Sequence, residues 1–161
     1  MAIQNFSWVI PNKLAGSAMP GKSVNPVDAH MYSDIQELFD NGIRCLVSLR
    51  HMPESFGTLC ERAGMEWVSF PIPDFGVPAD IDAFEGMIRQ SVAILRKQIP
   101  LCVHCYAGIG RTGIVLACIA GLYLSVDGNE AIERVRNSRL ALETDEQIVF
   151  VNTFLESIQR A

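Results

Sequence analysis

The sequence predicts a single α/β domain, and three observations support that prediction. The chain has 161 residues, enough for one domain to bury most of the apolar surface that its unfolded form exposes. Apolar residues make up 49% of it and charged residues 19%, a balance typical of a folded globular domain. Short apolar runs of strand length alternate with segments whose apolar residues recur at helical spacing. Because this alternation is typical of layered α/β domains, residues 1–161 are assigned to one domain.

The first half of the chain is predicted to alternate strands and helices. Ile35, Leu38 and Phe39 mark one face of a helix, which ends at the Asn41-Gly42 pair, a suitable C-cap. The elements expected around this helix are strands at 7–10 and 14–16, a strand at 45–49, a short helix at 54–62 and a strand at 67–70.

A loop stiffened by three prolines, from Pro71 to Pro78, leads into the second half. A helix begins near Asp80, because apolar residues then recur at helical spacing, with acidic residues in the first turn and Arg96-Lys97 in the last. A short strand at 101–103 runs directly into a glycine-rich loop. The elements expected after it are a helix from Arg111 or Thr112 and helices at about 129–137 and 144–158.

The glycine-rich loop, HCYAGIGRTG at residues 104–113, places five residues between Cys105 and Arg111. Its glycines let successive backbone N–H groups point inward as an anion-binding nest, to which the following helix adds its positive dipole end. Arg111 can hold two oxygens of a tetrahedral oxyanion at once. Cys105 would lie beneath them, where the same donors stabilise a thiolate suited to phosphoryl transfer. The residues predicted to bind phosphate are Tyr106, Ala107, Gly108, Ile109, Gly110 and Arg111.

Three other interpretations of this loop are weaker. A tight strand–helix turn with a buried cysteine explains the glycines but leaves Arg111 unpaired. A redox or metal pair of Cys102 with Cys105 lacks a second pair for zinc, and the two side chains would face opposite sides of an extended strand. A Walker loop requires Lys-Ser/Thr after its last glycine, and the chain has no lysine there.

Charge and composition limit the partners. The formal net charge is −5 and no Lys/Arg block occurs, which argues against a nucleic-acid or acidic-membrane surface. The longest apolar run, Ile114 to Leu124, is too short to span a bilayer. The five cysteines lack a framework spacing and suggest reduced thiols. We therefore expect a cytoplasmic monomer with no secretory signal, no cofactor and no metal.

The segment HCYAGIGRTG resembles the CX5R signature loop of cysteine-dependent protein tyrosine phosphatases, His-Cys, five residues, then Arg-Ser/Thr. Its place late in the chain excludes low-molecular-weight phosphatases and arsenate reductases of that type. The opening segment NFSWVIPNKLAGSAMP is similar to the start of small atypical dual-specificity phosphatases of the VHZ kind. The chain lacks the length and the phosphotyrosine-recognition insertions of the larger tyrosine phosphatases. The resemblance implies their fold, a central mixed sheet of about five short strands flanked by helices.

The resemblance also implies roles for residues beside the nucleophile. Asp74, in the segment PIPDFGVP, resembles the general acid that protonates the departing oxygen, although Pro-Asp is also good turn chemistry. Thr112 corresponds to the family's Ser/Thr, which donates to the cysteine sulfur, and it could also cap the helix. His104 would orient the loop through hydrogen bonds, or it is a satisfied core histidine.

Gln147 corresponds to a glutamine that positions the hydrolytic water in the family. The run from Thr144 to Gln147 equally matches a capping box, with Thr144 at the N-cap and Gln147 at N3. The family usually shows Arg-Pro ahead of this segment, whereas this chain has Ser138-Arg139, so the local backbone can differ.

The resemblance and the loop chemistry together predict a two-step phosphatase without a metal. Cys105 attacks phosphorus while Asp74 protonates the leaving oxygen, and water then hydrolyses the phosphocysteine. The expected substrate is a phosphotyrosine protein or peptide, with phosphoserine and phosphothreonine as further candidates. The uncharged Tyr106, Ala107 and Ile109 argue against polyphosphorylated lipid heads. Two alternatives stay open: an RNA 5′-triphosphatase or other non-protein phosphomonoesterase of the superfamily, and a phosphopeptide-binding pseudophosphatase.

Overall fold

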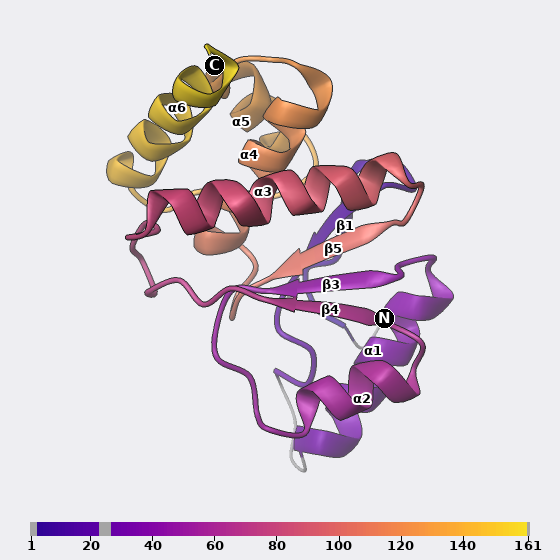
Figure 1. Ribbon diagram of the computed structural model, residues 1–161. Helices are drawn as coiled ribbons and strands as arrows, with labels where there is room; N and C mark the ends of the chain where they lie inside the picture. The colour runs from indigo at the N-terminus through magenta and orange to yellow at the C-terminus, as the bar shows by residue number, and fades with distance from the viewer. Residues whose placement is uncertain (1–2, 23–26, 161) are drawn as a thin grey trace.

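The computed structural model describes residues 3–22 and 27–160, which form a five-stranded sheet with helices on both faces (Figure 1). Strand β1 pairs with β2 antiparallel, and the pairings of β2 with β5, β5 with β3 and β3 with β4 are parallel. The sheet order β1-β2-β5-β3-β4 confirms the predicted mixed sheet. The strands are Ser7–Ile10 (β1), Leu14–Ser17 (β2), Cys45–Ser48 (β3), Glu66–Ser69 (β4) and Leu101–His104 (β5).

Helices α1 and α2 cover one face of the sheet, α3 and α4 cover the other, and α5 and α6 pack against α4 (Figure 1). Their bounds are Val27–Asp40 (α1), Phe56–Arg62 (α2), Ile81–Arg96 (α3), Gly110–Leu124 (α4), Gly128–Arg136 (α5) and Asp145–Gln159 (α6). The predicted α4 began too late, because Gly110 already has helical backbone geometry and Ile109 is the N-cap.

Helix α4 is the central helix of the larger layer. Every residue from Gly110 to Gly121 is buried, because α3, α5 and α6 surround the side that the sheet leaves free. This burial explains why the helix after Thr112 is apolar all round rather than amphipathic. In the described part of the chain no single helix is long and apolar enough to cross a membrane, and only α4 and α5 together, bent by 118°, satisfy length and composition.

The carboxyl ends of the four parallel strands meet at one edge of the sheet. In the strand register, His104 pairs with both Ser17 and Ser48, and Ser48 pairs with Ser69. The loops that follow these four residues therefore lie next to one another, although they are far apart in the sequence. Open α/β sheets bind their ligands at this edge.

Candidate active site

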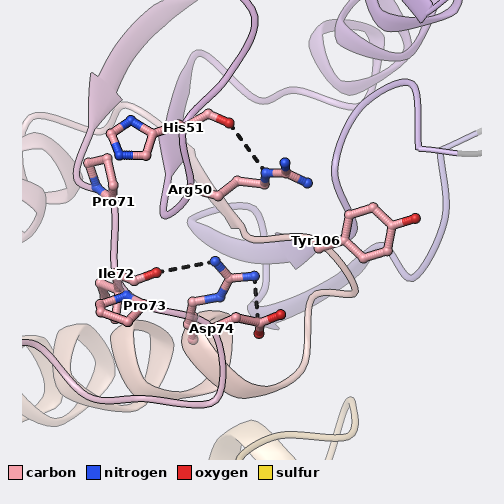
Figure 2. A pocket seen from close by; sticks show the side chains of 8 residues that line it. Arg50, His51, Pro71, Ile72, Pro73, Asp74 and Tyr106 are labelled. Carbon is pink, nitrogen blue, oxygen red and sulfur yellow. Dashed lines mark hydrogen bonds and ion pairs between the residues drawn. The ribbon is translucent and has the colours of Figure 1, made fainter.

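A pocket of about 610 Å³ lies where these loops meet (Figure 2). Figure 2 shows Arg50 and His51 on one side of it, Asp74 on the other, and Tyr106 beside them. The loops after β3, β4 and β5 and the start of α4 supply the residues that line the pocket: Arg50, His51, Pro71, Ile72, Pro73, Asp74, Tyr106 and Arg111. The structure thus brings the predicted acid and the predicted phosphate-binding arginine to one cavity.

The loop after β5 curls around the sulfur of Cys105. The backbone N–H of Gly108 donates to Cys105 Sγ at 3.3 Å, and Gly108 has a φ of +82°. A Cβ at this position would collide with the carbonyl oxygen of Ser17, so both the conformation and the close approach require glycine. The Cys105 side chain is only 3% exposed, which restricts access to groups that enter the loop.

The carbonyl oxygens of residues 105–109 each accept a hydrogen bond from a donor outside these five residues. These bonds are His104 Nδ1 to Cys105, Met19 N to Tyr106, Asn5 Nδ2 to Ala107, Arg139 Nη2 to Gly108, and the N–H groups of Gly113 and Leu142 to Ile109. Among the described residues, the backbone N–H groups of residues 106–110 donate one hydrogen bond, from Gly108 to the Cys105 sulfur. The other amides of the loop are therefore available to an anion.

Arg111 joins this loop to the loop after β4. Its side chain is buried, Nη1 donates to the carbonyl oxygen of Ile72 at 3.2 Å, and Nη2 lies 3.3 Å from Asp74 Oδ1 (Figure 2). Its Nε has no hydrogen-bond partner among the described residues. A buried N–H group without a partner is costly, so this donor favours an anion bound in the pocket.

Asp74 lies in a tight turn at the rim of the pocket. The turn is closed by the N–H of Gly76, which donates to the Pro73 carbonyl oxygen at 3.0 Å, while Asp74 Oδ1 accepts from the N–H of Phe75 at 3.0 Å. The N–H of Ile72 donates to the Leu49 carbonyl at 2.9 Å and anchors the segment to the end of β3. The turn interpretation of Asp74 is correct, and the turn also brings the carboxylate to Arg111.

His104 is fully buried at the end of β5, in a chain of hydrogen bonds. Its Nδ1 lies 3.1 Å from the Cys105 carbonyl oxygen and its Nε2 2.6 Å from Ser48 Oγ, which also accepts from Trp67 Nε1–H at 2.9 Å. A carbonyl only accepts, so Nδ1 carries the proton and Nε2 accepts from the Ser48 hydroxyl. Burial lowers the pKa of His104 to about 4, so the ring is neutral at pH 7. It is therefore a satisfied core histidine whose N–H holds the start of the loop.

We expect this buried ring to make stability depend on pH between about 6.5 and 4. Below pH 6.5 the unfolded chain takes up a proton at His104, whereas the folded protein does so only near pH 4, where its pKa lies. The free energy of unfolding should therefore fall as the pH falls through this window, by on the order of 2 kcal/mol from this residue.

Denaturant unfolding at pH 7 and pH 4.5 measures this contribution. In His104→Asn the amide can still donate to the Cys105 carbonyl, but no imidazole titrates. The variant should therefore lose less stability on acidification than the wild type, because the carboxylates of the two proteins are the same. Identical pH dependences would contradict a neutral, buried His104.

Thr112 does not cap α4, so that prediction is wrong. The helix begins two residues earlier, at Gly110, and its N-cap Ile109 makes no side-chain capping bond. The Thr112 hydroxyl is buried and has no hydrogen-bond partner within the described part of the chain. Its donation to the Cys105 sulfur stays a prediction.

Gln147 connects α6 to the turn that holds Asp74. Thr144 is the N-cap of α6 and its Oγ1 accepts from the Gln147 N–H at 3.1 Å, as a capping box predicts. The reciprocal bond differs, since Gln147 Oε1 accepts from the N–H of Glu143 at 2.7 Å rather than from that of Thr144. Its Nε2 donates to the Gly76 carbonyl oxygen at 3.3 Å. The side chain thus reaches the loop from Pro71 to Pro78 that carries Asp74, called here the acid loop, and its action on water stays a prediction.

Arg139 is a residue near the site that sequence reasoning did not assign to it. Its buried guanidinium donates to the carbonyl oxygens of Gly108 and Gly16 and to Ser7 Oγ, each at 2.8 Å. No described salt bridge includes it. Burial lowers the pKa of Arg139, and the attraction of nearby cysteine sulfurs opposes that decrease. This cation holds the predicted phosphate loop, residues 105–111, from outside. Its sequence signals were its place beside the apolar run Leu140 to Leu142 and the Ser138-Arg139 pair where the family usually shows Arg-Pro.

Cys102 and Cys105 lie on opposite sides of the sheet, which argues against a redox or metal pair. Cys102 belongs to the cluster under α1 and α2, and Cys105 to the cluster under α3 and α4. Burial raises the pKa of Cys102 to about 11. The described residues hold no group of three or more His, Cys, Asp or Glu side chains that could bind a metal ion.

Comparison with known proteins identifies the family. A family model described as "Polymorphic toxin system, DSP-PTPase phosphatase" matches residues 15–123, more than half of the chain. Cyclin-dependent kinase inhibitor 3 of Rattus norvegicus is 28% identical over 88% of this chain and 71% of its own length. Protein tyrosine phosphatase domain-containing protein 1 of Mus musculus is 28% identical over 93% of this chain, which spans only 21% of that protein.

Solved phosphatase structures share the fold. Tk-PTP in its active form has a TM-score of 0.78 at 24% identity, covering 94% of this chain and 96% of that one. Kinase associated phosphatase has a TM-score of 0.79 at 24% identity, covering 99% and 96%. With the family match over residues 15–123 and a CX5R loop at the end of β5, the chain belongs to the DSP-PTPase family of dual-specificity and tyrosine phosphatases.

Proposed function

We propose that this protein hydrolyses phosphotyrosine in proteins or peptides through a phosphocysteine intermediate. The convergence of three groups supports this proposal: the Cys105 sulfur inside an amide-lined loop, the Arg111 guanidinium, and the Asp74 carboxylate 3.3 Å from that guanidinium. They supply the nucleophile, the phosphate holder and the proton donor that displacement at phosphorus requires.

In the first step, Cys105 Sγ attacks phosphorus and a sulfur–phosphorus bond forms as the bond to the tyrosine oxygen breaks. Asp74 gives its proton to that oxygen, so a phenol leaves. The amides from Tyr106 to Arg111 and the guanidinium of Arg111 hold the three other phosphate oxygens. Such preorganised donors act on the charge that develops in the transition state and are usually the largest catalytic contribution.

In the second step, water attacks the phosphocysteine and Asp74 takes a proton back from it. The sulfur leaves as a thiolate, and the unpartnered hydroxyl of Thr112 is the group proposed to donate to it. Gln147 already bonds the Gly76 carbonyl two residues from Asp74, so its side-chain amide lies near the acid loop, where the water would be deprotonated.

Two exposed aromatic side chains favour an aryl phosphate. Phe75, next to Asp74, is 63% exposed and has a φ of +59°, and Tyr106, next to Cys105, is 44% exposed. A non-glycine residue held at positive φ costs energy, so the turn presents this ring to solvent at a price in stability. Aromatic rings beside the pocket can pack against the phenyl ring of phosphotyrosine, a gain that phosphoserine lacks.

Hydrolysis rates on matched phosphotyrosine, phosphoserine and phosphothreonine peptides test the proposal. The phosphotyrosine peptide should give the highest kcat/KM, and an acid quench during turnover should trap phosphate on Cys105. Faster hydrolysis of a 5′-triphosphorylated RNA than of any peptide would overturn the substrate class.

Asp74→Asn should slow phosphotyrosine peptides by about 10²-fold or more, the usual contribution of a general acid. The same change should slow p-nitrophenyl phosphate much less, because p-nitrophenolate leaves without a proton. When kcat/KM is measured over aryl phosphates of increasing leaving-group basicity, it should fall more steeply in Asp74→Asn than in the wild type.

Asp80→Asn is the matched control for this change. Asp80 caps α3 by accepting from the N–H of Ala83 at 3.0 Å, and it does not line the pocket. It should lower stability slightly and leave the dependence on the leaving group unchanged. If kcat/KM fell equally steeply with leaving-group basicity in the wild type and in Asp74→Asn, Asp74 would be only a turn residue.

A further inference from the structure

Two cations lie beside Tyr106 at the mouth of the pocket. The Arg50 Cζ is 5.5 Å and the Lys22 Nζ 4.9 Å from the centroid of the Tyr106 ring. Arg50 follows β3 and lines the pocket itself, and Figure 2 shows its guanidinium between His51 and Tyr106. Tyr106 is the residue after Cys105, so both cations lie beside the phosphate loop.

Contacts with the backbone fix where these cations lie. The Lys22 N–H donates to the carbonyl oxygen of Met19 at 3.1 Å, and the Met19 N–H donates to that of Tyr106 at 2.9 Å. Arg50 Nε donates to the His51 carbonyl at 3.3 Å. The segment after β2 and the segment after β3 are thus both held next to the phosphate loop.

Neither cation is paired with a carboxylate in the part of the chain that the structure describes. The four described salt bridges include neither Arg50 nor Lys22. A cation over an aromatic ring keeps its N–H donors free for an acceptor. Within those residues Arg50 uses only Nε in a hydrogen bond, so its two terminal nitrogens remain available to grip a carboxylate or phosphate.

The charge at the pocket is opposite to that of the whole chain. The net charge is −5, yet the described lining of the pocket has two arginines, Arg50 and Arg111, against one carboxylate, Asp74, and Lys22 lies beside it over the Tyr106 ring. Arg111 is already committed to the phosphate loop and the acid loop. Arg50 and Lys22, which lie beside the exposed Tyr106 ring, are therefore the cations at this pocket that these two loops do not use.

We propose that Arg50 and Lys22 form a second anion subsite that binds an acidic side chain next to the phosphotyrosine of a peptide substrate. This inference rests on the proposed function and adds sequence preference to it. An extended peptide whose phosphotyrosine enters the loop runs past the rim, where a neighbouring aspartate or glutamate meets the two cations. A polyphosphorylated headgroup is disfavoured, because positions 106, 107 and 109 inside the loop carry no charge.

Two phosphotyrosine peptides test the subsite, identical except that one has glutamates and the other glutamines on both sides of the phosphotyrosine. The wild type should prefer the acidic peptide in kcat/KM by about three- to tenfold, the effect of one or two partly exposed charge pairs. Arg50→Gln should bring this ratio close to one, and Lys22→Gln should reduce it partly. Higher salt should also reduce the ratio in the wild type.

Arg62→Gln is the matched control, because Arg62 also lies over a tyrosine ring, with its Cζ 4.5 Å from the centroid of Tyr32. It ends α2 and precedes the amino end of β4, so it lies at the opposite edge of the sheet from the pocket. This variant makes the same change in net charge and should keep the wild-type ratio. A ratio that falls equally in Arg62→Gln would reveal a general charge effect and overturn the subsite.

Four further outcomes would also overturn it. Equal wild-type rates on the two peptides, or a preference that survives in Arg50→Gln, would refute the subsite alone and leave the proposed function intact. Faster wild-type hydrolysis of a phosphoinositide in vesicles than of either peptide, lost in Arg50→Gln, would assign these cations to a lipid headgroup. Hydrolysis of neither peptide, with p-nitrophenyl phosphate still hydrolysed, would refute the proposed function and the subsite together.

Discussion

Cys105→Ser should lower kcat on phosphotyrosine peptides by on the order of 10⁴-fold or more, the scale of losing a catalytic nucleophile. A serine hydroxyl stays protonated in this loop and attacks phosphorus far more slowly than a thiolate. The loop that surrounds it should persist, because its carbonyl oxygens are held by donors such as Met19, Asn5 and Arg139, whose described hydrogen bonds do not include the sulfur. Binding of inorganic phosphate or vanadate should therefore survive, measured as an increase in Tm.

Cys102→Ser provides the matched control three residues away. Cys102 is fully buried on the opposite side of the sheet, and its Sγ lies 3.5 Å from Ser17 Oγ, so a hydroxyl can take its place in that contact. This variant should keep activity within about twofold of the wild type, as expected for a change outside the site. Equal inactivation by the two substitutions would restore the interpretation of the two cysteines as a redox pair.

The parts of the site that lie close together in the sequence were predictable from it. Gly108 was assigned to the phosphate loop because glycine permits the required backbone, and the structure places it at a positive φ against Ser17. The strands and the capping residues Asp80 and Thr144 also follow from local patterns. These features depend on neighbouring residues, so local sequence determines them.

Features that depend on packing between distant segments were not predictable. The hydrogen bond from Arg139 to Gly108 depends on the segment after α5 folding back beneath the phosphate loop. The approach of Lys22 to Tyr106 depends on parallel pairing of β2 with β5. Neither of these two contacts leaves a periodic or compositional signal in the sequence.

The start of α4 shows how such packing changes a local prediction. A glycine disfavours a helix interior, so the helix was expected to begin after Gly110. The structure begins it at Gly110, where a Cβ would collide with Glu143 Oε1 and approach Gln147 Nε2. Glycine at the first helical position lets the Glu143 side chain approach this closely, and the earlier start leaves Thr112 inside the first turn of α4 rather than at its cap.

Arg111→Lys should lower kcat/KM by about 10³-fold although the positive charge is kept, a loss comparable to removing a preorganised oxyanion donor. The guanidinium is a planar fork whose Nη1 bonds the Ile72 carbonyl and whose Nη2 lies 3.3 Å from Asp74, leaving Nε without a described partner. These contacts orient the fork so that it can bind two phosphate oxygens. A lysine ammonium is a single point, which cannot hold two oxygens in that geometry while also replacing the contact with the acid loop.

Steady-state kinetics on a phosphotyrosine peptide measure this loss, and Arg44→Lys is its matched control. Arg44 is a half-buried arginine that, like Arg111, donates to a backbone carbonyl, here those of Phe39 and Ile43. It precedes β3 at the edge of the sheet opposite the pocket. Its replacement should change stability and leave kcat/KM within about twofold of the wild type. In Arg111→Lys most of the loss should fall on kcat, because the bidentate grip matters most as charge develops on the phosphate oxygens. Near-normal rates in Arg111→Lys would show that this side chain serves only to anchor the acid loop through Ile72.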